Sequence, residues 1–287
     1  MKRATRLLIK AVGAAICGVS IGAAALEPGQ RPPLHLYSIG DSFTRAANAN
    51  LPGDNVYASW VNGYRGTFQK LLGLPNVNSH NQRIDALFGK SGRRNLTTAQ
   101  NGDSVKDMVV QATPVARYDV DYATVMLGAN DVCRSHPASL ITDAEFEAHV
   151  RNGMITLLNG LPLGATMLVV AIPNVKGVYD FGQTKKALGI TSCDRVWKLS
   201  GLCEAMLSEN STEVDRLYLQ SRNVGYNTIL ERVTGEMAMS YPGKFVRYSS
   251  ATFQLPFAQD QLSDIDCFHA SWQGQRAAAE LTWTFSP

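Results

Sequence analysis

The sequence predicts an α/β protein built on a mainly parallel sheet with helices on both faces. Short apolar runs typical of buried strands alternate along the chain with apolar residues at helical spacing. This alternation is typical of parallel sheets, whose crossover connections are helices. No internal repeat or linker interrupts the pattern, so we expect one domain rather than two.

The expected strands are the short apolar runs of the chain. Continuous apolar runs of this length are consistent with strands that are buried on both faces of a sheet. In chain order they cover residues 34–39, 83–88, 123–127, 167–172 and 245–249.

Two helical patterns stand out between these runs. The apolar residues within 57–72 recur at helical spacing and predict a helix with one face in the core. Thr142 and Glu145 form a capping-box pattern, and the apolar face that follows continues to Leu161. The sequence therefore predicts a second helix that begins at Thr142.

The rest of the chain adds two helical regions and one poorly patterned stretch. Helices are expected over about 204–238 and after Ser271. Residues 174–203 follow the fourth expected strand and show no clear period. We expect this stretch to be a loop that shapes a substrate pocket.

The first 25 residues have the layout of a secretory signal peptide. Four Lys and Arg residues come first, and an Ala- and Gly-rich apolar run ends at Ala25. The run is shorter than the roughly 20 apolar residues that span a bilayer, which argues against a stable membrane span. We therefore expect cleavage near Ala25, export to the periplasm or the medium, and a mature domain over residues 26–287.

Removal of the signal peptide changes the charge of the protein. The whole chain carries a formal charge of +3, but the mature part has 23 Lys and Arg against 24 Asp and Glu. A near-neutral chain argues against a nucleic-acid or membrane-surface partner, because both favour a basic excess. The sequence carries no prediction of the oligomeric state.

Four cysteines remain in the mature chain, an even number that suits disulfides in an exported protein. Cys193 and Cys203 are close in sequence and are the expected bridge, while Cys133 and Cys267 can pair only if the fold brings them together. No cysteine or histidine spacing typical of zinc accompanies them, so we expect neither a metal nor a cofactor.

Polar side chains follow the expected strands where ligands bind in open α/β sheets, at the carboxyl ends. Ser42 follows the first strand, Asn130 follows the third, and Asp266 and His269 follow the fifth. A serine becomes a nucleophile when a histidine accepts its proton and a carboxylate orients that histidine. These residues therefore predict a Ser42–His269–Asp266 triad.

An oxyanion intermediate needs hydrogen-bond donors, and the sequence offers three of them. These are the Asn130 side chain and the backbone N–H groups of Ser42 and Gly102, with Gly92 as the competing glycine. Gly-Asp-Ser occurs twice, but Ser42 directly follows an apolar strand and Ser104 follows polar residues. We therefore assign the nucleophile to Ser42 and a helix-start role to Ser104.

Four short blocks resemble the GDSL or SGNH hydrolases, whose motifs carry Ser, Gly, Asn and His in that order. They are "IGDSFT", with Phe43 where Leu is usual, then "AQNGDS", "LGAND" and "DCFH". The resemblance runs from about Leu34 to Phe285. It implies a flavodoxin-like three-layer α/β/α sandwich with five strands, the triad, and the oxyanion donors Ser42, Gly102 and Asn130. "GANDVC" and "DCFH" are most similar to the phospholipase B-like branch.

The resemblance implies an exported serine esterase or lipase that acts on a small ester or an acyl lipid such as a phospholipid or lysophospholipid. The same triad serves carbohydrate acetylesterases, arylesterases and thioesterases, so the substrate stays open. A secreted module that binds a glycan or lipid without catalysis is the alternative from another class. Retention of every catalytic residue type favours the enzyme.

Overall fold

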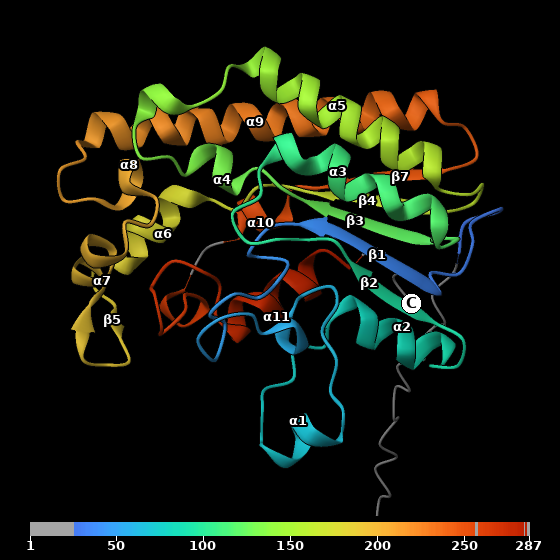
Figure 1. Ribbon diagram of the computed structural model, residues 1–287, viewed down its shortest axis with the longest axis horizontal. Helices are drawn as coiled ribbons and strands as arrows, with labels where there is room; N and C mark the ends of the chain where they lie inside the picture. The colour runs from blue at the N-terminus through green and yellow to red at the C-terminus, as the bar shows by residue number, and fades with distance from the viewer. Residues whose placement is uncertain (1–25, 256–257, 284, 286–287) are drawn as a thin grey trace, which may run out of the picture.

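The protein is an α/β sandwich with one five-stranded parallel sheet between two layers of helices (Figure 1). The computed structural model describes residues 26–255, 258–283 and 285. The strand order is β2-β1-β3-β4-β7, as in flavodoxin-like folds, and every pairing is parallel. The strands are β1 (His35–Gly40), β2 (Arg94–Thr97), β3 (Tyr122–Met126), β4 (Thr166–Val170) and β7 (Phe245–Ser249). The expected fold class is confirmed.

Each face of the sheet has its own hydrophobic core. Successive strand residues point to opposite faces, so Tyr37 packs in one core and Leu36 in the other. Helices α3, α5 and α9 cover the first face, and α2 and α11 cover the second (Figure 1). These helices are α2 (His80–Phe88), α3 (Met108–Ala112), α5 (Asp143–Gly160), α9 (Glu213–Ser240) and α11 (Trp272–Leu281).

The helices expected in the second half of the chain are confirmed. Thr142 Oγ1 accepts from the Glu145 backbone N–H at 3.2 Å, and the Glu145 carboxylate accepts from the Thr142 N–H at 2.8 Å. This is the predicted capping box at the start of α5. The 204–238 region contains α8 (Glu204–Leu207) and most of α9, and α11 begins after its N-cap Ser271.

The strand expected over 83–88 is wrong, because these residues belong to helix α2. Ser79 caps the helix, since its Oγ accepts from the Gln82 N–H and the Gln82 side chain accepts from the Ser79 N–H. The second strand is β2, at the edge of the sheet, where no residue is fully buried. An exposed edge strand has no apolar run, so the pattern could not reveal it.

The single core-facing helix expected over 57–72 is also wrong. Trp60 and Val61 are buried, but the chain turns sharply at Gly63, where a Cβ atom would lie 2.4 Å from the Ser59 carbonyl oxygen. Beyond this turn only the short helix α1 (Thr67–Leu71) forms, and none of its residues is buried. The apolar residues at helical spacing therefore belong to two different segments, a buried turn and a short exposed helix.

The stretch 174–203 is more ordered than expected. It contains α6 (Val175–Gly182), the small hairpin β5 (Lys186–Ala187) with β6 (Thr191–Ser192), and α7 (Cys193–Ser200). The turn between α7 and α8 ends this stretch, and a remaining short helix, α10 (Ala251–Gln254), comes after β7.

The disulfides pair differently from the expected Cys193–Cys203 bridge. The structure joins Cys133 to Cys203 and Cys193 to Cys267, with Cα atoms 4.5 and 5.6 Å apart. Cys193 begins helix α7 and Cys203 lies beyond its end, so about 12 Å of helix at 1.5 Å per residue separates them. Cysteines more than about 7 Å apart cannot be bridged.

Candidate active site

The chain turns sharply at the carboxyl end of β1 and exposes Ser42 there. Gly40 is required at this turn, because a Cβ atom would lie 2.1 Å from the Thr44 hydroxyl. The Asp41 carboxylate accepts from the Phe43 backbone N–H at 2.8 Å and stabilises the turn. Burial raises the pKa of Asp41 to about 7, against the effect of that hydrogen bond. Ser42 itself is half-buried.

The structure brings His269 and Asp266 to Ser42 from the other end of the chain. His269 Nε2 lies 2.9 Å from Ser42 Oγ, and His269 Nδ1 lies 2.6 Å from Asp266 Oδ2. The other carboxylate oxygen of Asp266 accepts from the backbone N–H groups of Phe268 and His269. The carboxylate therefore holds both the backbone and the ring of the histidine.

Asp266 is held in its charged form. Its side chain is only 8% exposed, and burial alone would raise its pKa. The hydrogen bond from His269, the histidine's charge and the hydrogen bond from Asn48 act in the opposite direction, and the pKa of Asp266 ends below its ordinary value. A carboxylate in this state can orient and stabilise an imidazolium.

Asn130 and Gly102 lie together at the carboxyl ends of the strands. Asn130 Nδ2 donates to the carbonyl oxygen of Asp103 at 2.8 Å, directly beside Gly102. A side-chain amide carries two N–H groups, so one remains for a ligand. Gly102 follows β2 and therefore lies at the carboxyl ends of the parallel strands. Gly92 precedes β2 and lies at their amino ends. This placement favours Gly102 over Gly92.

Ser104 lies apart from the triad geometry. Its Oγ contacts the Asp107 carboxylate at 3.1 Å, and it caps a short 3₁₀ helix at Val105–Asp107. This agrees with its expected place at a helix start.

Two side chains that support the site were missed by the sequence analysis. Asn48 donates to Asp266 Oδ2 at 2.7 Å from a polar loop that carries no recognisable spacing. Gln111 exchanges hydrogen bonds with both backbone groups of Gly40 and also donates to the Asp103 carboxylate. Gln111 is buried on an apolar helix face, and that contrast is the one signal that could have identified it.

Each disulfide ties down a segment of this site. Cys267 lies two residues before His269 and is bonded to the start of α7. Cys133 follows Asn130 by three residues, ends α4 (Ala129–Val132), and is bonded to Cys203. The bridges therefore restrain the loop that carries His269 and the short helix that carries Asn130.

A small apolar pocket opens beside Ser42 and His269. Its volume is about 50 Å³, far below the roughly 300 Å³ at which typical drug-sized ligand sites begin. A second, smaller cavity shares part of its wall, including Phe43 and Pro173. The remaining lining residues of the pocket are Asp41, Ala129, Val175, Val178, Phe268 and Ala270.

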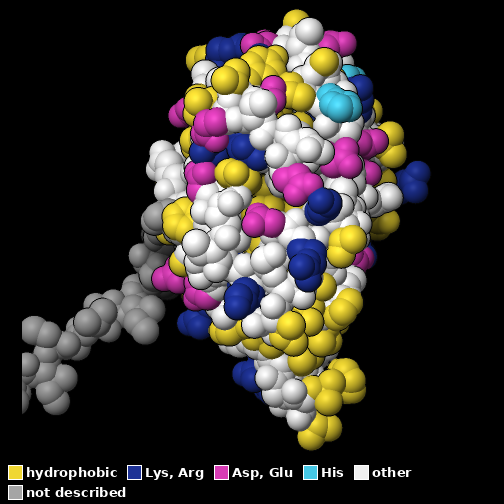
Figure 2. All heavy atoms as spheres, turned by 90° about the vertical axis from the view of Figure 1, so that its left-hand side faces the viewer, with side chains coloured by type: hydrophobic (Ala, Val, Ile, Leu, Met, Phe, Trp, Pro, Cys, Tyr) yellow, Lys and Arg dark blue, Asp and Glu magenta, His cyan; other side chains and the backbone are white. Residues whose placement is uncertain are grey.

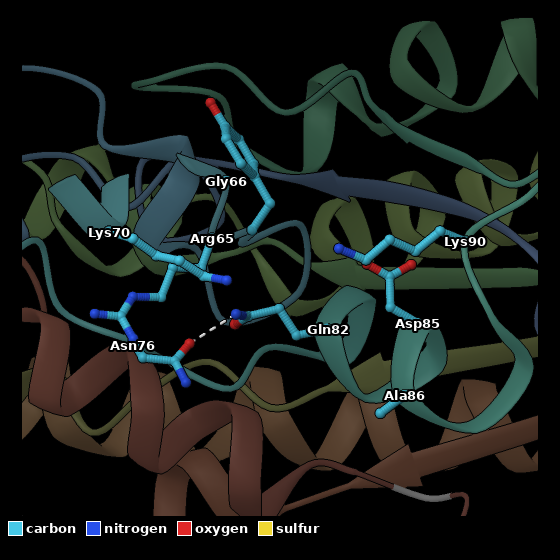
Figure 3. Close-up of a pocket in the computed structure, with 9 residues that line it drawn as sticks. Arg65, Gly66, Lys70, Asn76, Gln82, Asp85, Ala86 and Lys90 are labelled. Atoms are coloured by element: carbon cyan, nitrogen blue, oxygen red, sulfur yellow. Dashed lines mark hydrogen bonds and ion pairs between the residues drawn. The ribbon is translucent and has the colours of Figure 1, made fainter. Parts of the chain in front are cut away.

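A larger cleft of about 480 Å³ lies between α2 and the segment that contains α1 (Figure 3). Arg65, Lys70 and Asn76 lie on one side of it, and Asp85 and Lys90 lie on the other. The cleft is lined by none of the residues that make up the triad geometry.

Across 26–255, 258–283 and 285, no three His, Cys, Asp or Glu side chains are grouped to hold a metal ion. In the same part of the chain, no helix is both long and apolar enough to cross a bilayer.

We expect Asn48 to act as a positioning residue for Asp266. Its loss should lower turnover about tenfold, because a hydrogen bond to a buried charged group contributes roughly 1.5–3 kcal/mol. Asn48 has a positive φ of 53°, so Asn48→Gly removes the donor without straining the backbone. We expect kcat to fall while KM stays within a few-fold. The role would be contradicted if activity fell only because less protein was folded. In that case the melting temperature would drop, and the folded fraction would still be labelled normally by a fluorophosphonate probe.

One family model and several solved structures are similar to this chain. The model of the family described as GDSL-like Lipase/Acylhydrolase matches residues 36–282. No curated protein sequence matches the chain. The crystal structure of LAE5, an alpha/beta hydrolase enzyme from the metagenome of Lake Arreo, Spain, has a TM-score of 0.51 and 14% identity over 92% of this chain and 100% of that one.

Two further solved structures are more distant. A family 3 carbohydrate esterase of Clostridium thermocellum has a TM-score of 0.47 and 12% identity, over 86% of this chain and 92% of that one. The extracellular lipase of Streptomyces rimosus has a TM-score of 0.43 and 14% identity, over 86% and 97%. At these identities the likeness concerns the fold alone, whereas the family model covers most of the chain. The chain therefore belongs to the GDSL-like lipases and acylhydrolases and is a hydrolase of ester bonds.

Proposed function

We propose that this enzyme hydrolyses carboxylic esters through a Ser42–His269–Asp266 triad and an acyl-enzyme. The observation that carries the proposal is the unbroken relay of hydrogen bonds, 2.9 Å from Ser42 Oγ to His269 Nε2 and 2.6 Å from His269 Nδ1 to Asp266 Oδ2. Asp266 in its charged form selects the tautomer with the proton on Nδ1, so Nε2 is free to accept the serine proton.

The proposed reaction proceeds in two halves. His269 Nε2 takes the Ser42 proton as Oγ attacks the ester carbonyl carbon, and a tetrahedral oxyanion forms. When this intermediate collapses, the bond to the alcohol oxygen breaks and His269 donates the proton to that oxygen. Water then attacks the acyl carbonyl carbon as His269 takes its proton. The bond to Ser42 Oγ breaks, His269 returns the proton to Oγ, and the carboxylic acid leaves.

The proposed oxyanion donors are the backbone N–H groups of Ser42 and Gly102 and the side-chain amide of Asn130. Their support is the bond from Asn130 to Asp103, which sets the amide beside Gly102 at the carboxyl edge of the sheet. Fixed donors at this place stabilise charge that develops only as the serine attacks. They therefore lower the free energy of the transition state more than that of the bound substrate.

The experiment that tests the triad is labelling with a fluorophosphonate probe. An activated serine reacts with the probe, whereas a pocket that merely binds a glycan or lipid does not. We expect the intact protein to be labelled at Ser42 and the Ser42→Ala protein to be unlabelled. Labelling at another residue in the folded variant would reject the assignment.

The pocket volume of about 50 Å³ favours a short acyl group, such as acetyl or butyryl. Phe43 belongs to the wall that this pocket shares with the neighbouring cavity, so Phe43→Ala should join the two spaces. We expect the variant to shift its highest kcat/KM among p-nitrophenyl esters toward longer chains, by about tenfold relative to the acetate. An unchanged preference would show that Phe43 does not limit acyl length.

Carbohydrate acetylesters fit this short pocket, whereas a phospholipid or lysophospholipid is the second candidate substrate. The observation that favours lipid is the surface of α1, where the apolar side chains of Phe68 and Leu71 are exposed and the basic residue Lys70 lies between them in sequence. The same ester series separates the two candidates, because a lipid substrate requires high kcat/KM on long-chain esters and an acetyl substrate does not.

Export is proposed on the basis of the two disulfides, which persist in oxidising compartments. The expected signal peptide, residues 1–25, lies outside the described residues. Mass spectrometry of a non-reduced digest of the exported protein should yield linked Cys133–Cys203 and Cys193–Cys267 peptides and an N-terminus at Leu26. Free thiols or a Cys193–Cys203 peptide would contradict the pairing, and a retained Met1 would contradict the cleavage.

A further inference from the structure

The segment of residues 64–75, here called the α1 projection, presents an exposed apolar surface. It extends away from the sheet and the other helices at the lower end of the molecule (Figure 1). Phe68, Leu71 and Leu72 are 64%, 81% and 54% exposed, and Tyr64 beside them is also exposed. Hydrophobic atoms accordingly gather at the lower tip of the molecule in Figure 2. Contiguous exposure of large apolar side chains is unusual and marks interaction sites.

Basic side chains lie next to this surface. Arg65, Lys70 and Lys90 line the cleft between the α1 projection and α2 (Figure 3). The one acidic residue in its lining, Asp85, is bonded to Arg93 and also lies 3.9 Å from Lys90 Nζ. The cleft therefore carries excess positive charge.

We propose that the α1 projection docks this protein on the surface of an anionic phospholipid bilayer. The apolar tip lies farthest from the sheet, and α2, which is followed closely by Lys90, lies nearer to the sheet (Figure 1). A bilayer presents phosphate groups outside and apolar chains beneath them, in the matching order. Phe68 and Leu71 enter the acyl boundary, and Arg65, Lys70 and Lys90 bind lipid phosphates.

The near-neutral charge of the mature chain argues against a membrane-surface partner only if charge is spread evenly. Attraction to anionic lipid acts within about 8–10 Å at physiological salt, so local charge decides it. In the cleft, three basic residues meet one acidic residue, which pairs with Arg93 and lies 3.9 Å from Lys90. The local charge of the cleft, rather than the net charge of the mature chain, therefore governs attraction to an anionic bilayer.

The proposal is tested by sedimentation with lipid vesicles, using the Ser42→Ala protein so that lipid is not consumed. We expect binding to phosphatidylcholine vesicles that contain phosphatidylglycerol, weaker binding at high salt, and little binding to pure phosphatidylcholine. Leu71→Ser should weaken binding about tenfold or more, and Arg65→Gln or Lys70→Gln about fivefold each. The proposal does not rest on ester hydrolysis, because vesicle binding is measured without turnover.

Met239→Ser is the matched control, because Met239 is equally exposed but lies on α9, on the other side of the sheet. It should bind vesicles like the parent protein. In the active enzyme, Leu71→Ser should keep hydrolysis of a soluble short-chain ester and its melting temperature, which shows that the fold is intact. The proposal would be overturned if the protein did not bind anionic vesicles, or if Leu71→Ser and Met239→Ser affected binding equally. A protein partner for the α1 projection would then be the alternative.

Discussion

Ser42→Ala should lower kcat for ester hydrolysis by at least about 10⁴-fold, because without the hydroxyl no acyl-enzyme forms. The substitution removes one oxygen from a half-buried side chain whose hydrogen bond is to His269. The melting temperature should therefore stay close to that of the parent. The measurement is kcat on a p-nitrophenyl ester together with thermal unfolding of the same preparation.

Two comparisons make the result decisive. Ser104→Ala should keep most of the activity, because the Ser104 hydroxyl donates to Asp107 at a helix start. His269→Ala should be about as inactive as Ser42→Ala, and the double variant should lose little more, since triad members act as a unit. If losses from the two single variants multiply in the double variant, or if folded Ser42→Ala turns over normally, the triad assignment fails.

Asn130→Ala is expected to lower kcat by about 10²–10³, the usual effect of removing one oxyanion donor. Substrate binding should change far less, because the ester carbonyl carries little charge before attack. Asn130 also donates to the Asp103 carbonyl, so some loss of melting temperature accompanies the change. The two effects separate when kcat and the thermal midpoint are measured on one preparation.

The competing role for Asn130 is purely structural. In that case Asn130→Ala would lower the melting temperature while kcat of the folded protein stayed within a few-fold of the parent. His269→Ala supplies the inactive reference, and it defines the background against which a 10²-fold loss must be measured. A stable Asn130→Ala enzyme with near-normal kcat would remove the oxyanion role.

Much of the scaffold could be predicted because its signals are local. Buried strands produce continuous apolar runs, and β1, β3, β4 and β7 were found by them within one or two residues. Capping boxes are encoded within four residues, so the start of α5 was found as well. The order of the polar turns along the chain then indicated that Ser42, Asn130 and His269 would meet at one edge.

The features that the sequence did not predict depend on contacts between distant segments. The edge strand β2 is defined only by its pairing with β1, and the bridge Cys193–Cys267 joins residues 74 positions apart. Asn48 supports Asp266 across 218 positions, which no local spacing can indicate.

By itself, the sequence determined the layered α/β architecture, most of its helices and strands, and the membership of the chain in a family of ester hydrolases. The tertiary structure alone decided the cysteine pairing, the small volume beside Ser42, and whether the apolar residues within 57–72 lie inside or outside. The physical reason is that hydrophobic periodicity reports which side chains share a face, whereas only the packed chain decides whether anything covers that face.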